Sequence, residues 1–169
     1  MDDTTHVREL EDREEIRQIF VEYARCLDSG NHAGYAALFA TDGVMVAQLG
    51  EAVGPAAIEA TLDEHLGPQV RGHLPRAIHV MNNQRIDLHG DTATTTVIWF
   101  YLTTDPDGVP TVLQAGQYVD DLVREHGAWK IARHDISRIM GRSPMDPPPR
   151  TRVDALEELV EVEGDGDLA

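Results

Sequence analysis

Residues 76–139 read RAIHVMNNQRIDLHGDTATTTVIWFYLTTDPDGVPTVLQAGQYVDDLVREHGAWKIARHDISRI. β-Branched and aromatic side chains fill four long runs of this stretch, and short glycine-containing segments separate the runs. The pattern predicts strands at about 76–88, 92–104, 111–124 and 128–139. Because the connections are short and rich in turn residues, we expect consecutive strands to pair in antiparallel fashion.

The preceding residues predict helices. An apolar stripe at helical spacing, flanked by acidic residues in the first turns, predicts an amphipathic helix over 10–27. A short second helix is expected to reach Phe39, followed by a turn at Thr41-Asp42-Gly43 and a strand at 44–49. Gly54-Pro55 is typical of the start of a third helix. Helices followed by an antiparallel meander predict the α+β class.

Composition excludes several classes of function. The chain has 169 residues and 41% apolar content, enough for one domain with a real core. It carries 14 Lys and Arg against 30 Asp and Glu, a formal net charge of −16. This balance argues against nucleic acid or an anionic membrane as a partner, because phosphate groups require clustered cations.

The single cysteine, Cys26, excludes an intrachain disulfide and is typical of a reduced compartment. The N-terminal residues show no apolar signal segment, and the longest apolar run, Val97 to Leu102, is too short to span a bilayer. We therefore expect a cytoplasmic protein.

A change of composition near residue 142 predicts a domain boundary. Residues 1–141 are expected to form the folded domain, and 142–169 a proline-rich linker with an acidic C-terminal tail. The apolar positions of the tail predict one short docking helix, which would cover a neighbouring subunit or act as a lid.

Strong catalytic motifs, such as a nucleotide-binding glycine loop or a Gly-x-Ser-x-Gly elbow, are absent from the sequence. Instead, several short motifs follow one another over residues 10 to 140. They are Ile16-x-x-Ile19-Phe20-x-x-Tyr23-Ala24-x-x-Leu27-Asp28, Leu38-Phe39-Ala40-Thr41-Asp42-Gly43, His79-x-x-Asn82, Gly90-Asp91-Thr92-Ala93, Gly116-Gln117-Tyr118-x-Asp120 and Gly127-x-Trp129-Lys130-Ile131. Their order and spacing resemble SnoaL-like proteins of the nuclear transport factor 2-like superfamily.

The resemblance implies a cone-shaped fold, in which a strongly curved antiparallel sheet wraps around N-terminal helices and leaves a central, mostly apolar pocket. It implies no cofactor, and we see no metal-ligand spacing among the histidines. A homodimer or higher homo-oligomer through the sheet is expected, because both faces of the first long strand are largely apolar.

Asp28 and His79 are the predicted catalytic dyad. They match the Asp and His that scytalone dehydratase, hexachlorocyclohexane dehydrochlorinase and bile-acid dehydratase use. An imidazole accepts a proton near neutral pH, and a carboxylate on its other nitrogen fixes the tautomer. The plain alternative is that Asp28 bonds the turn after its helix and that His79 is structural.

Tyr23 faces the predicted core, and the resemblance implies that its phenol bonds a substrate oxygen; a buried structural tyrosine is the alternative. His134 is a minor candidate for the pocket, as a second acid or base. The ordinary explanation for charged residues in this last strand is a cross-strand ion pair, such as Asp120 with Arg133. Asp42 resembles the position of the base in ketosteroid isomerase-like relatives, but it also fits an ordinary turn.

Further pocket candidates lie on the first two long strands. Trp99 and Tyr101 share one face and would clasp a flat or alicyclic substrate, although such pairs are often plain sheet packing. Strand alternation places Met81 on the face of His79 and Asn82 on the opposite face.

The predicted function is a cofactor-independent, dehydratase-like elimination (a lyase) on a small hydrophobic cyclic substrate. His79 would remove a proton from carbon and Asp28 would orient the imidazole. Two alternatives stay open: a SnoaL-type polyketide cyclase or isomerase that uses the same dyad, and a non-catalytic module for small-ligand binding or assembly.

Overall fold

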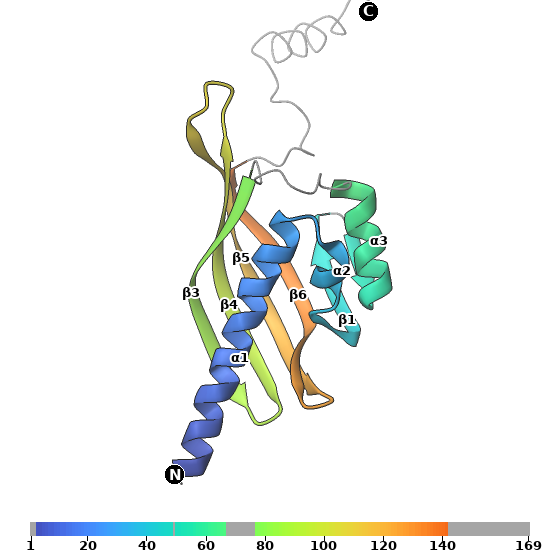
Figure 1. The fold of residues 1–169 in the computed structure, drawn as a ribbon, viewed down its shortest axis with the longest axis vertical. Coiled ribbons are helices and arrows are strands. Elements are labelled where there is room, and N and C mark those ends of the chain that lie inside the picture. The colour runs from blue at the N-terminus through green and yellow to red at the C-terminus, as the bar shows by residue number, and fades with distance from the viewer. Residues whose placement is uncertain (1–2, 49, 67–76, 142–169) are drawn as a thin grey trace, which may run out of the picture.

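A computed structural model describes residues 3–48, 50–66 and 77–141 (Figure 1). Three helices and six strands follow one another in this part of the chain. They are α1 (Asp3–Asp28), α2 (His32–Ala36), β1 (Phe39–Ala47), β2 (Gly50–Val53), α3 (Pro55–Leu66), β3 (Ala77–His89), β4 (Thr92–Thr104), β5 (Pro110–Glu125) and β6 (Ala128–Gly141).

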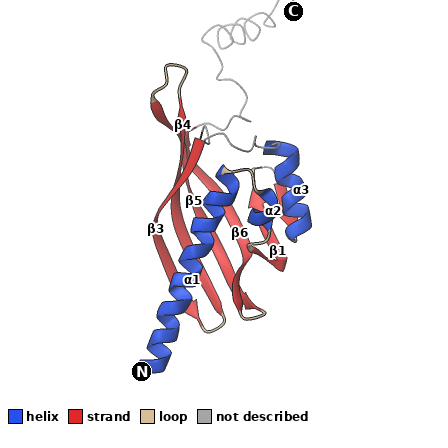
Figure 2. Ribbon diagram, viewed as in Figure 1, coloured by secondary structure: helices blue, strands red, loops and turns tan. Residues whose placement is uncertain are grey.

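The strands form one curved, open sheet in the order β2-β1-β6-β5-β4-β3. All neighbours pair in antiparallel fashion except β1 and β6, which run parallel. The three helices lie on one face of the sheet, with α1 crossing it diagonally (Figure 2). The predicted α+β class and the curved sheet around N-terminal helices are confirmed.

Helix α1 supplies the side of the core that faces the sheet. Ile16, Phe20 and Tyr23 are buried at helical spacing, whereas Glu11 and Glu14 are exposed on the opposite side of the helix. The helix ends at Asp28 because Gly30 adopts a left-handed backbone conformation, with φ of 67°. The amide of Asn31 then donates to the carbonyl of Cys26 at 2.8 Å. This turn fixes the position of Asp28 at the C-terminal end of the helix.

A bulge divides β3. Asn82 pairs with Ile98 and Arg85 with Thr96, so two residues of β3 face the single residue Val97. Asn83, inside the bulge, has φ of 53°. The extra residue reverses the alternation, which turns both Met81 and Ile86 toward the helices.

The structure corrects three local predictions. The second helix ends at Ala36, and Phe39 begins a strand instead. Thr41-Asp42-Gly43 lies inside β1, because an irregularity between Phe39 and Val44 lets the strand continue past the turn-like residues. The sequence pattern also missed β2, which pairs with β1. The four long strands lie within a few residues of their predicted bounds.

Arg124 ties α1 to the hairpin end of the sheet. Its guanidinium pairs with Asp12, and with Asp91 at 3.0 Å, and it lies 4.7 Å from the centre of the Trp129 ring. Trp129 in turn donates its backbone N–H to Glu15 at 2.9 Å. One partly buried cation therefore neutralises acidic charge of the helix.

The predicted linker and tail, 142–169, lie outside the described residues. No helix in the described part of the chain is long and apolar enough to cross a membrane.

Candidate functional site

The C-terminal end of α1 lies beside the start of β3, and this junction brings Asp28 and His79 together (Figure 1). The carboxylate of Asp28 lies 2.6 Å from Nδ1 of His79. It also accepts the backbone N–H of His79, with N···O distances of 3.1 and 3.2 Å. Each side chain is 16% exposed, so the pair is largely sheltered and still reachable.

This arrangement fixes the imidazole chemically. When Nδ1 donates to the carboxylate, Nε2 of a neutral ring is left as a free base. The backbone hydrogen bond holds the strand at the same carboxylate, which limits how far the ring can shift. Asp28 also lies in the last turn of α1, where a negative charge opposes the helix dipole. The contacts with His79 offset that local cost.

Tyr101 is the cross-strand neighbour of His79, and the centres of the two rings are 4.8 Å apart. Burial, and then the negative charge of Asp28, raise the pKa of the Tyr101 phenol above its ordinary value. The phenol therefore stays protonated at neutral pH and can donate a hydrogen bond. The next pair on this face is Met81 with Trp99.

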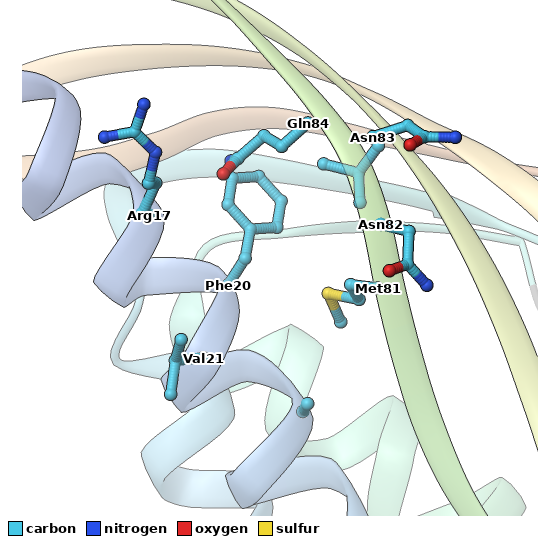
Figure 3. A pocket seen from close by; sticks show the side chains of 9 residues that line it. Arg17, Phe20, Val21, Met81, Asn82, Asn83 and Gln84 are labelled. Atoms are coloured by element: carbon cyan, nitrogen blue, oxygen red, sulfur yellow. The ribbon is translucent and has the colours of Figure 1, made fainter.

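A groove of about 600 Å³ opens between α1 and β3 (Figure 3). Its apolar lining comes from both elements and from β4, and consists of Phe20, Val21, Ala24, Met81 and Val97. Ala24 lies one helical turn before Asp28, and Met81 lies two residues after His79 on the same face of the strand. The groove therefore begins next to the dyad.

Polar side chains complete this groove. Arg17 belongs to α1, whereas Asn82, Asn83 and Gln84 come from the bulge in β3. Gln84 follows the reversed alternation and extends toward α1 (Figure 3). Its Nε2 is buried and has no hydrogen-bond partner in the described part of the chain. Burying an amide N–H without a partner costs about 1–3 kcal/mol.

A second Asp–His pair lies deeper, in the core. Nδ1 of His134 pairs with one carboxylate oxygen of Asp120, and the other oxygen accepts the Thr95 hydroxyl at 2.9 Å. Nε2 of His134 lies 3.1 Å from the Tyr23 hydroxyl. His134 and Asp120 are fully buried, and Tyr23 is 1% exposed. Burial raises the pKa of Tyr23 well above its ordinary value, so the phenol is neutral.

The sequence analysis did not foresee this second pair. The predicted ion pair of Asp120 with Arg133 is wrong: Arg133 pairs instead with Asp135, at 2.9 Å. Register explains the difference, because Asp120 lies directly opposite His134. Alternation from the buried Trp129 and Ile131 would instead have turned Arg133 inward. An extra residue between Ile131 and Arg133, which pair with Leu122 and Asp121, reverses the alternation and places His134 inside.

The predicted site residues thus fall into three places. Asp28 and His79 touch each other, and Tyr101 lies against the imidazole. Met81 and Asn82 line the groove. The remaining candidates, Trp99, Tyr23 and His134, are buried in the core cluster or its polar centre. Within the described ranges, no group of three or more potential metal ligands comes together.

Comparisons with known proteins identify the family and the fold of the chain. The profile of the SnoaL-like domain matches residues 8–135. The chain belongs to the SnoaL-like domain family. An uncharacterized protein of Mycobacterium tuberculosis is 30% identical over 128 residues, which cover 75% of this SnoaL-like chain and 85% of the relative.

Solved structures share the SnoaL-like fold. A crystal structure of an NTF2-like protein with a cystatin-like fold from Novosphingobium aromaticivorans is 26% identical, with a TM-score of 0.72 over 85% of this chain and 94% of that one. A protein from Catenulispora acidiphila, solved in complex with S-DNPA, is 27% identical, with a TM-score of 0.63 over 75% and 92% of the two chains. Membership in the NTF2-like superfamily is therefore confirmed.

Proposed function

We propose that this SnoaL-like protein is an enzyme that removes a carbon-bound proton from a small hydrophobic cyclic substrate and expels water. The observation that carries the proposal is the contact of Asp28 with Nδ1 of His79, at 2.6 Å. That contact leaves Nε2 as the base, and the limited exposure of the pair reduces competition from water.

The proposed reaction needs one base that can also act as an acid. Nε2 of His79 takes a proton from the carbon next to a carbonyl group, and the C–H electron pair forms an enolate. The enolate then forms the C=C bond as the β-hydroxyl group leaves. The imidazolium returns its proton to the departing oxygen, so the net change is the loss of one water molecule and His79 ends as it began.

The neighbouring residues have distinct roles in this proposal. Asp28 is a positioning residue, because it acts on the substrate only through the imidazole, and its charge stabilises the imidazolium that forms. The protonated Tyr101 phenol donates a hydrogen bond to the carbonyl oxygen as negative charge develops there. The Tyr101 ring lies against the His79 imidazole, so both side chains are on the same face of the sheet.

Comparison with a similar protein supports ligand binding by this fold. The Catenulispora acidiphila protein was solved in complex with S-DNPA.

Cyclisation and isomerisation by the same dyad begin with the same proton transfer as elimination. The three reactions differ only in what the enolate does next.

The test uses purified protein and a panel of cyclic β-hydroxy ketones, with a β-hydroxycyclohexanone and its benzo-fused homologue as first members. Formation of the conjugated enone is followed by absorbance and the product is identified by NMR. His79→Ala and Asp28→Asn are compared with His89→Ala, which removes an exposed histidine from the end of the same strand.

We expect the enone with wild-type protein and with His89→Ala, and rates near the uncatalysed reaction with His79→Ala. Equal activity of His79→Ala and wild type would remove the dyad from the mechanism. Ring-closed or isomerised products that depend on His79 would replace elimination by one of the alternatives.

We also propose that a second copy of the chain covers the outer face of the sheet. Two apolar rows cross this face: Ile78, Leu102 and Val112 are consecutive register partners, and so are Val80 and Phe100. Ile78 and Val112 are exposed. Light scattering should give the mass of a dimer or a higher homo-oligomer, and Val112→Glu should reduce it to that of one chain; a wild-type monomer would contradict the proposal.

A further inference from the structure

The groove between α1 and β3 combines an apolar floor with one unsatisfied amide, on Gln84, and one weakly paired cation, Arg17. Phe20, Ala24 and Met81 belong to the floor, and Val21 borders it with 55% of its surface exposed. Arg17 and Gln84 lie on opposite walls, on the helix and on the strand (Figure 3). Such a pairing of an apolar surface with a few polar groups is typical of a site for a small amphipathic molecule.

Gln84 is placed there by the bulge. Without the extra residue in β3, Met81 and Gln84 would point to opposite faces of the sheet. The bulge turns Gln84 toward α1 together with Met81. It also gives Asn83 a left-handed backbone, which asparagine adopts more readily than most residues. The Nε2 donor of Gln84 is buried without a partner in the described structure. A ligand oxygen would supply the missing acceptor.

Arg17 determines the charge of that ligand. It is the one cationic side chain among the described residues that line the groove. Its ion pair with Glu14 is long, at 3.6 Å, and both partners are more than half exposed. Such pairs are weak, so the guanidinium is free to bind a better-placed anion. Because the chain carries a net charge of −16, a single carboxylate fits this site better than a polyanion.

The position of the groove connects it to the dyad. Ala24 precedes Asp28 by four residues of helix, about 6 Å. Met81 follows His79 by two residues of strand, about 7 Å. A molecule that reacts at His79 therefore extends into the near end of the groove. Arg17 precedes Asp28 by eleven residues of helix, about 16 Å, so only an elongated molecule reaches from His79 to Arg17.

We infer that this groove binds the carboxylate-bearing arm of the substrate, with the carboxylate held by Arg17 and by the Nε2 donor of Gln84. The inference rests on the proposed function for the place of the reacting carbon. The substrate class becomes an elongated hydrophobic cyclic monocarboxylic acid, with the reacting ring at His79 and the acid group about 16 Å away, at the far end of the groove.

The test is a binding experiment that needs no turnover. Naphthaleneacetate and naphthaleneacetamide have the same shape and differ in charge, and each is titrated into isotope-labelled full-length protein. Amide NMR spectra report the backbone signals of the groove and the side-chain NH₂ signal of Gln84. The variants are Arg17→Gln, Arg17→Lys and Gln84→Leu. The matched control is Arg85→Gln, which removes a cation that is exposed on the same strand and pairs with Asp87.

We expect naphthaleneacetate to shift the groove signals. Arg17→Gln should weaken its binding about three- to tenfold and leave naphthaleneacetamide within about twofold, because only the charged bond is lost. Arg17→Lys should restore part of the affinity, Gln84→Leu should weaken both probes, and Arg85→Gln should change neither. Equal effects of Arg17→Gln and Arg85→Gln, or no groove shifts at millimolar probe, would overturn the inference.

Failure of the subsite and failure of the proposed function give different results. His79→Ala leaves the groove intact, so it should still bind naphthaleneacetate. If the probe does not bind the groove but enone formation depends on His79, the carboxylate subsite is overturned and the proposed function stands. If the probe binds the groove but His79→Ala keeps full activity, the catalytic dyad is overturned and the carboxylate subsite stands.

Discussion

The carboxylate of Asp28 binds His79 twice, through the imidazole Nδ1 at 2.6 Å and through the backbone N–H at 3.1 and 3.2 Å. The two bonds join the end of α1 to the beginning of β3. The same carboxylate therefore sets the orientation of the ring and the position of the strand that carries it. A merely structural contact would not require the ring nitrogen, since the backbone bond alone already links the two elements.

Asp28→Asn should separate these two tasks. The amide oxygen of the variant can still accept a hydrogen bond, but it carries no charge to stabilise an imidazolium. We expect kcat to fall by about two to four orders of magnitude, and the free energy of unfolding by no more than about 1–2 kcal/mol. Steady-state kinetics and urea unfolding measure the two quantities. A large loss of stability with unchanged kcat per folded molecule would make the pair structural.

Tyr101→Phe should impair the reaction without loosening the fold. The variant keeps the ring beside His79 and removes only the hydroxyl group that the raised pKa keeps protonated. Loss of one such donor to a developing oxyanion lowers kcat by about a hundredfold. Steady-state kinetics together with the melting temperature check this prediction, and an unchanged kcat would remove the phenol from the mechanism.

His134→Ala should have the opposite profile to His79→Ala. It leaves the fully buried Asp120 carboxylate without its N–H partner, and leaves the Tyr23 hydroxyl without its acceptor. Removing one member of a buried pair costs about 3–5 kcal/mol. His79 is partly exposed, so its removal should cost much less stability. Urea unfolding of both variants measures the contrast, and equal losses would contradict the distinction between the two pairs.

Arg124→Met should change how stability depends on pH. Burial alone would raise the pKa of Asp12, but the hydrogen bond and the charge of Arg124 hold it below its ordinary value. The unfolded chain then binds a proton at a higher pH than the folded chain. The stability from this group is complete above the unfolded pKa, about 3.9, and is lost as the pH falls through the lower folded value.

The variant lacks the cation that lowers this pKa. We therefore expect Arg124→Met to be less stable at pH 7 and to lose less additional stability on acidification below about pH 4. Urea unfolding across this pH range measures both curves. Two parallel curves would show that the Asp12 pair contributes nothing to the acid sensitivity of the protein.

Gly116→Ala should strain the centre of the sheet. A Cβ atom at Gly116 would lie 2.0 Å from the carbonyl oxygen of Ser137 and 2.4 Å from Cζ2 of Trp99. Overpacking of this kind costs about 3 kcal/mol. Gly90→Ala is the comparison: its Cβ would meet open space, and its φ of 69° costs only about 1–2 kcal/mol. A smaller loss for Gly116→Ala than for Gly90→Ala would contradict the packing argument.

Local patterns in the sequence were sufficient for the long elements. Helical spacing of apolar residues predicted α1, and the β-rich runs predicted β3 to β6. The resemblance to the SnoaL-like family identified Asp28 and His79, which the fold brings into contact. Each of these signals depends on residues that are close in sequence or on motifs of fixed order.

Features that depend on register were missed for a physical reason. The bulge in β3 is defined by the pairing of Asn82 and Arg85 with β4, and no local pattern marks the extra residue. The parallel contact of β1 with β6 and the opposition of Asp120 and His134 likewise join distant parts of the chain. Consequently the sequence alone could not predict that the Gln84 side chain points into the groove.

The most direct test of the central claim isolates proton abstraction from every later step. β-Tetralone has acidic carbon-bound protons next to a carbonyl group and no leaving group, so an enolate can only take up a proton again. In deuterated water, NMR measures how fast deuterium enters that carbon. We predict exchange well above the buffer rate with wild-type protein and at the buffer rate with His79→Ala. Exchange that is equally fast with both proteins would contradict the assignment of His79 as the base.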